Sequence, residues 1–247
     1  LGTIESISQI KSKDVKAFVK KYFVQENMEV YVSSPLSLSE VKKAVQNTLL
    51  KKIPTNKKFV SLPMYEFEVA DDNFYEVKTE PIGKSYLMAN FVIPCMPKDF
   101  KRIKKLELLL KLINNHEEGI MDELRWGGDK NLTYSAWFNS TQGKNERVVT
   151  FYTECSKENV KPIMETLAGY INKIKEKGFS QKVFDFEKRS YKFYDDAVEK
   201  MLSGEFHKLY DFRLYGKVRS QKEMRKYIDE TTLADCNALF HEIFDNP

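Results

Sequence analysis

The sequence predicts an α+β fold: a mainly antiparallel sheet with helices packed on one face, preceded by the last helix, strand and helix of a homologous unit. Three observations support this prediction. Strand-like segments come before a long run of helical periodicity, which is typical of α+β domains. Two alternating segments flank a short polar tip, which predicts a hairpin. The beginning of the chain also resembles its end.

The third observation is an internal repeat. A shift of 221 positions places Ile7 on Ile228 and Asp14 on Asp235, and the positions between them keep their apolar or polar character. The first copy continues into NMEVYV, whose alternation and β-branched residues predict a strand over residues 28–32. The second copy stops before such a strand. The repeat therefore predicts that the chain holds the close of one unit and most of the next.

The predicted elements of the first 55 residues are two helices around this strand. Apolar residues spaced by three and four predict a helix that opens at Ser12 or Lys13. A second helix follows the strand, with Ser37 or Ser39 as its N-cap and Pro54 as its end.

Four segments of the second unit have strand character. Residues 74–80 (FYEVKTE) alternate, and residues 85–94 (SYLMANFVIP) are almost continuously apolar, which predicts a strand buried on both faces. Residues 133–140 and 147–156 alternate around a polar tip and predict an antiparallel pair.

Helices account for the remainder. Asp99 precedes a strongly apolar helical stripe, and a shorter helix follows it. A helix with an apolar face begins near Val160, and Gly178 is its expected C-cap. Ser180 is expected to cap a long helix. Two capping boxes, Ser220 with Glu223 and Thr232 with Asp235, predict two further helix starts.

The repeat divides the chain into three parts. Residues 1–55 are the closing helix, strand and helix of a preceding homologous domain, residues 56–70 are a linker, and residues 71–247 are the main domain. An unfilled strand position leaves backbone groups unpaired, so residues 28–32 are expected to complete the sheet of the main domain. The pairing is open between the same chain and a neighbouring copy, which would give a homodimer by strand exchange.

Composition narrows the class of protein. The chain has 247 residues, 42% hydrophobic and 31% charged, which is typical of a globular protein. Its 40 basic and 36 acidic residues are interleaved and leave a net charge of +4, so no nucleic-acid partner is expected. No apolar run has membrane-spanning length, so no membrane partner is expected. Three separated cysteines fit a reducing, cytoplasmic location, with an upstream targeting segment left open.

Two stretches resemble a known family. The N-terminal LGTIESISQIKSKDVKAFVKKYFVQENMEVYVSS resembles the end of one domain of the insulinase-type zinc metallopeptidases, which include pitrilysin and the mitochondrial processing peptidase. FVIP, followed by LELLLKLINNHEEGIMDELRWGGDKNLTYSAWF, looks like the second, non-zinc domain of the same family. The resemblance implies the domain repeat, a peptide substrate and membership of a proteolytic class.

The chemistry of that family is incomplete here. Its zinc-bound water needs two histidines on one helical turn with a glutamate between them, in the pattern His-x-x-Glu-His. This pattern does not occur, and His116, His207 and His241 are widely separated. We therefore expect no catalytic residue, no metal ligand and no cofactor in this chain. The resemblance implies that a zinc-bearing homologous domain or subunit supplies the metal.

Two residues of this chain match substrate-binding positions of the family. The resemblance implies that Arg125 and Tyr134, in LRWGGDKNLTY, hydrogen-bond the substrate backbone. An arginine offers several donors to carbonyl oxygens, and a phenol can stabilise a developing oxyanion. The family usually has six residues between the pair, whereas eight stand between them here. The alternative is that Arg125 is a helix C-terminal cation and Tyr134 packs on the sheet. Asn114 and Asn115 also replace the family's glycines.

These observations leave two main hypotheses. The first is the non-catalytic half of a clamshell peptidase, which forms a wall of the peptide-binding chamber and contributes substrate-binding residues. The alternative is a catalytically dead structural or assembly subunit of the same family. A third reading, an RNA-binding module, lacks a stacking platform and concentrated basic charge.

Overall fold

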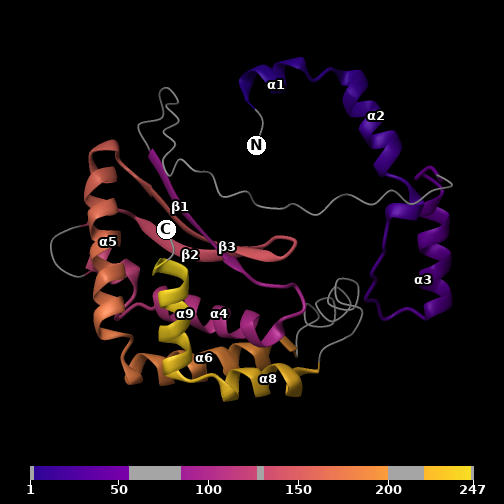
Figure 1. The fold of residues 1–247 in the computed structure, drawn as a ribbon. Coiled ribbons are helices and arrows are strands. Elements are labelled where there is room, and N and C mark those ends of the chain that lie inside the picture. Colours follow the sequence, from indigo (N-terminus) through magenta and orange to yellow (C-terminus); the bar gives the residue numbers. More distant parts are fainter. Residues whose placement is uncertain (1–2, 56–84, 127–130, 200–219, 246–247) are drawn as a thin grey trace. The chain divides into compact units, whose positions relative to one another are not determined.

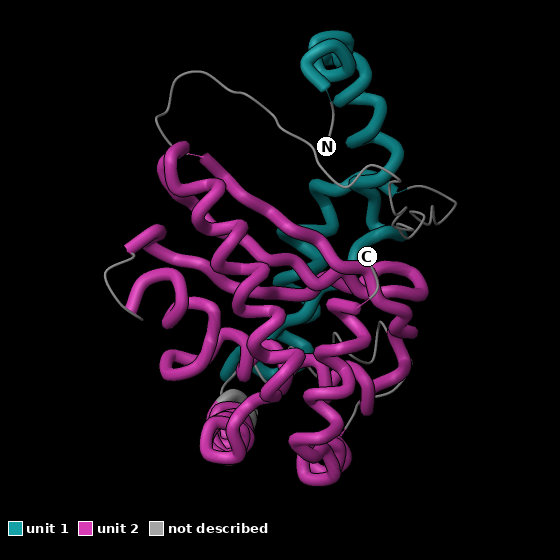
Figure 2. Tube along the Cα trace, turned by 60° about the vertical axis from the view of Figure 1, so that its left-hand side comes forward, with its two compact units in different colours: residues 1–63 teal, residues 64–247 magenta. Residues whose placement is uncertain are grey.

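The computed structural model describes residues 3–55, 85–126, 131–199 and 220–245 (Figure 1). The chain forms two compact units, residues 1–63 and residues 64–247 (Figure 2). Most of the predicted linker and the predicted strand 74–80 lie outside the described residues, so both stay predictions.

Unit 1 is a set of short helices with almost no core. Val24 is the single buried side chain among its described residues. The side-chain amide of Gln25 donates to the carbonyls of Leu50 and Ile53 (both 2.8 Å) and joins the middle of the unit to its C-terminal part. The elements are α1 (Ile4–Gln9), α2 (Ser12–Tyr22), η1 (Gln25–Asn27), α3 (Leu38–Val45) and η2 (Gln46–Leu50).

Local sequence explains where these helices begin. Ser37 accepts a hydrogen bond from the Glu40 N–H, and the Glu40 carboxylate accepts one from the Ser37 N–H (2.8 Å). This capping box starts α3. Hydrogen bonds from Ser37 hold the pKa of Glu40 below its usual range.

The predicted strand over residues 28–32 is not formed in the structure. A strand exists only when its backbone pairs with another strand. Unit 1 offers no such partner, because its described elements are all helical. The prediction from local pattern was therefore wrong for the segment as described, while its pairing with a sheet elsewhere stays a prediction.

The described residues of unit 2 form a three-stranded antiparallel sheet with the strand order β1-β3-β2. The strands are β1 (Ser85–Pro94), β2 (Ser135–Gln142) and β3 (Glu146–Cys155). The register pairs Phe91 of β1 with Val149, and Phe138 of β2 with Phe151. The predicted hairpin is confirmed, and β3 occupies the centre of the sheet.

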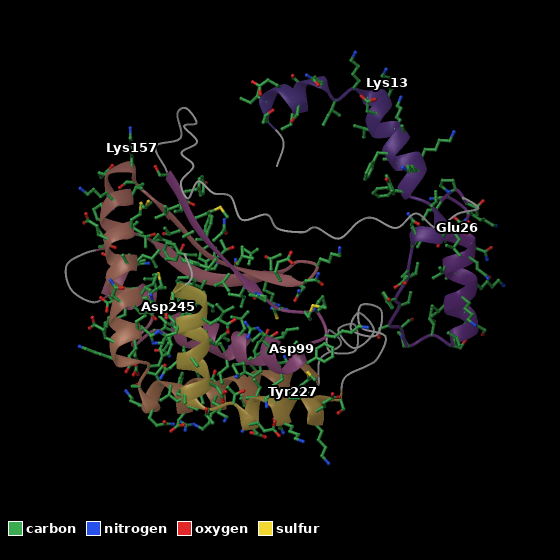
Figure 3. All side chains as sticks on the ribbon, in the orientation of Figure 1. Lys13, Glu26, Asp99, Lys157, Tyr227 and Asp245 are labelled. Carbon is green, nitrogen blue, oxygen red and sulfur yellow. The ribbon has the colours of Figure 1, made fainter. Side chains whose placement is uncertain are left out.

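One face of this sheet is covered by helices. Helices α4 (Phe100–Ile113), α6 (Gln181–Glu199), α8 (Gln221–Glu230) and α9 (Leu233–Asp245) lie on the same side of it, with α5 (Val160–Lys177) beside them (Figure 1). Figure 3 draws the side chains that fill the space between these helices and the sheet. Together they form one large apolar core. The α+β fold with helices on one face is confirmed.

The prediction that β1 is buried on both faces was wrong. Its burial alternates: Leu87, Ala89 and Phe91 pack against the core, whereas Tyr86 and Met88 are exposed. Exposing a single apolar side chain to water costs little free energy. A strand that is continuously apolar in sequence is therefore not necessarily buried on both faces. The second face of the sheet is therefore open over these residues.

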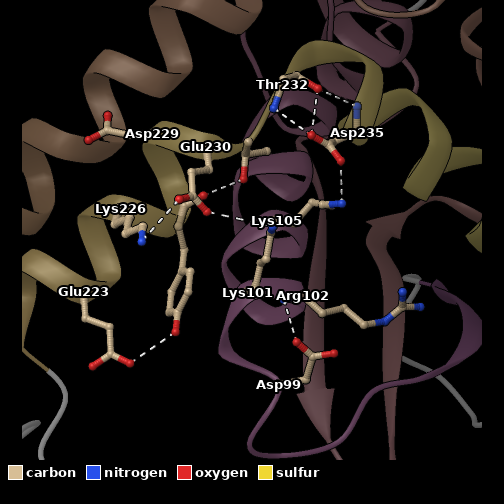
Figure 4. Close-up of polar contacts among 12 residues, drawn as sticks. Asp99, Lys101, Arg102, Lys105, Glu223, Lys226, Asp229, Glu230, Thr232 and Asp235 are labelled. Atoms are coloured by element: carbon tan, nitrogen blue, oxygen red, sulfur yellow. Dashed lines mark hydrogen bonds and ion pairs between the residues drawn. The ribbon is translucent and has the colours of Figure 1, made fainter.

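The predicted helix boundaries match the structure well. Asp99 caps α4 by accepting from the Arg102 N–H (3.0 Å; Figure 4). Ser220 accepts from the Glu223 N–H (3.1 Å) and starts α8. Gly178 ends α5 with φ +68°, a left-handed conformation that favours glycine. Side-chain and backbone hydrogen bonding thus fixes the ends of the helices that form the core.

Candidate functional site

Arg125 lies on a short helical turn that is anchored in the core. The turn is η3 (Asp122–Trp126), and its Leu124 side chain is fully buried. The Leu132 N–H donates to the Leu124 carbonyl oxygen (2.9 Å). This bond joins the chain on either side of residues 127–130, which lie outside the described residues. Leu124 and Leu132 are therefore held together, although eight residues, and not the expected six, separate Arg125 from Tyr134.

Tyr134 is placed by the threonine that precedes it. The hydroxyls of Thr133 and Thr153 lie 2.7 Å apart, and Thr133 also donates to the Glu154 carbonyl (2.8 Å). Thr133 is buried, whereas Tyr134 is 81% exposed. The alternative in which Tyr134 packs on the sheet is thus wrong, because its side chain projects from the start of β2 into solvent.

The structure brings Arg125 and Tyr134 together. The guanidinium carbon of Arg125 lies 4.7 Å from the centroid of the Tyr134 ring and 4.5 Å from that of Trp126. Its Nη1 donates to the Tyr134 carbonyl oxygen (2.6 Å). Each cation–π contact at an exposed site is worth about 0.5–1 kcal/mol. Two rings and a hydrogen bond therefore fix the direction of the guanidinium.

Both side chains keep hydrogen-bonding capacity. Among the described residues, the Tyr134 hydroxyl makes no hydrogen bond, and the Arg125 guanidinium makes only the one to Tyr134. A guanidinium has five N–H donors in a planar fork, so most of them are available to carbonyl oxygens. Arg125 also lies in the last turn of η3, so its role as a helix C-terminal cation is compatible with the same geometry.

Trp126 is a member of this group that the sequence did not reveal. It is exposed and stacks on Arg125. Its position directly after the arginine was a visible signal, since an aromatic neighbour can orient a guanidinium. We call Arg125, Trp126 and Tyr134 the Arg125 cluster.

The open face of the sheet carries a row of aromatic side chains. The Tyr152 ring on β3 lies 4.7 Å from Trp137 on β2 and 6.1 Å from Tyr86 on β1, between ring centroids. Tyr86 and Trp137 are exposed. The sequence did not predict this row because β1 was read as buried on both faces. We call Tyr86, Tyr152 and Trp137 the aromatic row.

The two asparagines at the family's glycine positions serve structural purposes. The Asn114 side chain accepts from the Phe138 N–H and donates to the Phe138 carbonyl (both 2.8 Å), as a neighbouring strand would. Asn115 is buried; its Oδ1 accepts from the Glu117 N–H (2.7 Å) and its Nδ2 donates to Glu187 (2.6 Å). These bonds fix the loop after α4, so it is held rigidly against β2.

A shallow groove of about 450 Å³ lies beside η3. It is bordered by Glu123 and by Lys173 of α5, whose side chains form an ion pair of 2.6 Å. The Tyr170 hydroxyl in its floor is buried and has no hydrogen-bond partner among the described residues. Burial raises the pKa of Tyr170 well above its usual range, so the hydroxyl stays protonated.

The histidines do not form a metal site in the part of the chain that the structure describes. His116 is exposed, and the Nδ1 of His241 lies 2.9 Å from an Asp245 carboxylate oxygen. His207 lies outside the described residues. The described residues contain no cluster of three or more potential ligands among histidine, cysteine, aspartate and glutamate. No described helix is long and apolar enough to cross a membrane.

Comparison with known proteins identifies the family. A family model described as "Peptidase M16 inactive domain" matches residues 9–191, about three quarters of the chain. The chain therefore belongs to the M16 peptidase family, in the class of its inactive domains. The suspected insulinase-type family is thereby confirmed. The sequence matches no individual curated protein significantly.

Solved structures share the fold at low identity. A protease from Helicobacter pylori is 17% identical with a TM-score of 0.76, and the match covers 98% of this chain and 58% of that one. A predicted insulinase family protease from Yersinia pestis is 14% identical with a TM-score of 0.69, covering 96% and 54%. An M16 inactive domain from Pseudomonas fluorescens is 17% identical with a TM-score of 0.63, covering 98% and 57%. This chain spans somewhat more than half the length of each.

Proposed function

We propose that this chain is the non-catalytic half of a clamshell zinc metallopeptidase, and that it forms a wall of the chamber in which a peptide is held. A zinc-bearing homologous domain or subunit provides the metal and its water. The observation that carries the proposal is the Arg125 cluster. The Arg125 guanidinium is oriented by two exposed rings and keeps N–H donors that can bind a peptide. The Tyr134 phenol lies beside it.

The chemistry of the cluster suits an extended peptide. Arg125 donates N–H groups to backbone carbonyl oxygens, and the Tyr134 hydroxyl donates to an oxyanion that develops on a carbonyl under attack. When bound in the companion domain, zinc supplies a hydrolytic water. The residues of this chain bind and orient the peptide, and no proton transfer is assigned to them.

The aromatic row supports the same proposal. Exposed rings on an open sheet face offer apolar contact to the side chains of a peptide, with little loss of side-chain entropy. Because the Trp137 and Tyr152 rings already contact each other, the surface is formed before any peptide arrives. The wall is thus the open sheet face, and the Arg125 cluster stands at the start of β2.

The test is peptide hydrolysis by the enzyme reconstituted with its zinc-bearing partner. Arg125→Ala and Tyr134→Phe should each lower kcat/KM by about 10- to 100-fold, in the range of a lost oxyanion or carbonyl donor. Arg189→Ala and Tyr194→Phe are matched controls, because both residues are exposed on α6. Unchanged kinetics in both cluster variants, with unchanged melting temperature, would contradict the proposal.

The alternative is a catalytically dead assembly subunit of the same family. The same assay separates the two functions, because a scaffold tolerates cluster variants that leave its folding intact. We also expect the chain alone to bind no catalytic zinc and to cleave no peptide. Stoichiometric zinc in the purified chain, with peptidase activity that a chelator removes, would show otherwise.

A further inference from the structure

Strand β2 has one edge that no described strand covers, because it ends the strand order β1-β3-β2. The N–H and C=O groups of alternate residues in a strand point to opposite edges. Residues 134, 136 and 138 point theirs to this uncovered edge, since their groups bond to side chains outside the sheet. Unpaired groups at an edge are a template on which a further strand can form.

Asn114 satisfies both backbone groups of Phe138. Its Oδ1 accepts from the Phe138 N–H and its Nδ2 donates to the Phe138 carbonyl, both at 2.8 Å. A strand that added to this edge would make the same two bonds with its own backbone. The Asn114 carboxamide therefore occupies the hydrogen-bonding position of an added strand.

Two further side chains cover the edge toward the start of β2. The Met121 sulfur accepts from the Ala136 N–H (2.9 Å), although sulfur is a weak acceptor. Arg125 donates to the Tyr134 carbonyl (2.6 Å). We call Asn114, Met121 and Arg125 the edge seal. It binds one or both of the outward backbone groups at three consecutive edge positions.

The backbone that carries Asn114 is fixed on both sides. Before it, α4 ends with the Asn114 N–H donating to the Leu110 carbonyl (3.0 Å). After it, the loop folds so closely on itself that a Cβ at Gly119 would lie 2.2 Å from the Asn115 carbonyl oxygen, so only glycine fits there. The edge seal is thus formed in the free chain and does not depend on a flexible loop.

We propose that the edge seal prevents an extended polypeptide from adding to β2 as a further strand over residues 134–138. Such a strand would have to displace the three side chains. Its bonds would mostly replace hydrogen bonds that already exist, instead of adding to them. The association itself costs translational and rotational entropy. The exchange is therefore unfavourable, and this edge of the sheet is closed.

The inference concerns strands of any origin and does not depend on the proposed function. For the chain's own predicted strand, residues 28–32, it excludes this edge, both within one molecule and in a homodimer formed by strand exchange. For a peptide substrate, a point that does rest on the proposed function, it leaves the Arg125 cluster and the aromatic row as the contacts.

Amide exchange in the unaltered chain tests the edge seal without any variant. Ser140 has the next N–H that points to this edge, and no side chain of the described residues bonds to it. The Phe138 N–H should exchange with solvent at least about 100-fold more slowly than the Ser140 N–H. Equal exchange rates of the two amides would overturn the inference.

Asn114→Ala removes both bonds to Phe138 and should open the edge. Asn90→Ala is the matched control, because it removes a side-chain hydrogen bond to Thr150 (2.8 Å) on the open sheet face. In Asn114→Ala, the Phe138 amide should exchange at least about 10-fold faster, while the Trp137 amide, which points to β3, keeps its rate. Asn90→Ala should change neither amide. An unchanged Phe138 amide in Asn114→Ala would contradict the assigned role.

A synthetic peptide of residues 26–34 (ENMEVYVSS) serves as the strand probe. It should bind Asn114→Ala at least about 10-fold more tightly than the parent chain or Asn90→Ala, and it should restore protection of the Phe138 amide. Equal binding to all three proteins would overturn the inference. None of these measurements involves peptide hydrolysis, so the inference can fail while the proposed function survives, and the reverse also holds.

Discussion

Helix pairs α1–α2 and α8–α9 share a pattern and differ in surroundings. In both, apolar residues recur at helical spacing and an aspartate caps the second helix. One pair is buried under the sheet of unit 2, and the other is exposed. Amphipathic periodicity therefore indicates which face of a helix is to be covered. It does not indicate whether the cover belongs to the same folding unit.

Truncating a side chain at matched positions of the two helix pairs should give the largest difference in stability. Phe240 is 1% exposed and Val19, its counterpart, is 45% exposed. Phe240→Ala should cost about 3–5 kcal/mol in the free energy of unfolding, because it leaves a cavity against Phe179 and Phe244. Val19→Ala should cost less than about 0.5 kcal/mol in the chain alone. Urea unfolding measures both, and comparable losses would mean that α2 is covered within this chain.

The capping aspartates give the next largest difference. Asp235 is the third residue of α9 and forms a capping box with Thr232. Its carboxylate also accepts from Lys105 (2.7 Å), and this bond holds the pKa of the carboxyl well below the usual range. Asp235→Asn should cost about 1–2 kcal/mol, since it removes an ion pair and weakens a cap. Asp14→Asn should cost a few tenths of a kcal/mol, because the side-chain oxygen of asparagine can still accept from the Lys11 N–H.

The effect of Asp235 should depend on pH in one direction. Its folded-state pKa is depressed, so its contribution is fully present above the unfolded value of about 3.9 and is lost as pH falls through the folded pKa. The stability difference between Asp235→Asn and the parent chain should thus be constant near neutral pH and shrink in strong acid. A difference that instead grew on acidification would contradict the assigned ion pair.

Local signals were sufficient for most of the fold. Asp99, Ser180 and Ser220 were identified as helix starts because capping depends on side chains within three residues. The two errors, the burial of β1 and the strand at 28–32, concern contacts between distant segments. Whether a strand finds a partner, or a face finds a cover, depends on tertiary structure that local pattern does not contain.

Only part of the candidate site could be predicted, because its other features also depend on tertiary structure. Arg125 and Tyr134 were found through family resemblance, and the structure places them side by side. Trp126 and the aromatic row were missed, because the first needs the direction of a side chain and the second needs the register of three strands. Asn114 could not be recognised as a partner of β2, since the two bonds join residues 24 positions apart.

Residues 28–32 test whether a segment next to α2 pairs with the sheet of unit 2. The sequence predicted that they pair with the sheet of unit 2, in the same chain or in a neighbouring copy. The described elements of unit 1 are all helical, so within that unit these residues have no strand to pair with. In the chain alone, we expect the amides of residues 28–32 to exchange rapidly with solvent. Val30→Asp should change the free energy of unfolding by less than about 0.5 kcal/mol. Protection of these amides in a monomer would instead support pairing with unit 2.

Substitutions at Lys21 and at its counterpart Glu242 test the charge that differs between the two helix pairs. The Lys21 ammonium nitrogen lies 4.9 Å from the centroid of the neighbouring Tyr22 ring and forms no ion pair with any described residue. Lys21→Glu should therefore change the free energy of unfolding by no more than a few tenths of a kcal/mol.

At the matched position, Glu242→Lys replaces the ion pair with Arg102 by two like charges, the new lysine and Arg102 itself. This change should lower the free energy of unfolding by about 1 kcal/mol. Adding Arg102→Glu to Glu242→Lys should restore most of that loss, because the pair is then re-formed with its signs exchanged. A double-mutant cycle measures this coupling directly. If Glu242→Lys proved as silent as Lys21→Glu, or if Arg102→Glu failed to rescue it, the Arg102–Glu242 ion pair would not account for a difference between the two helix pairs.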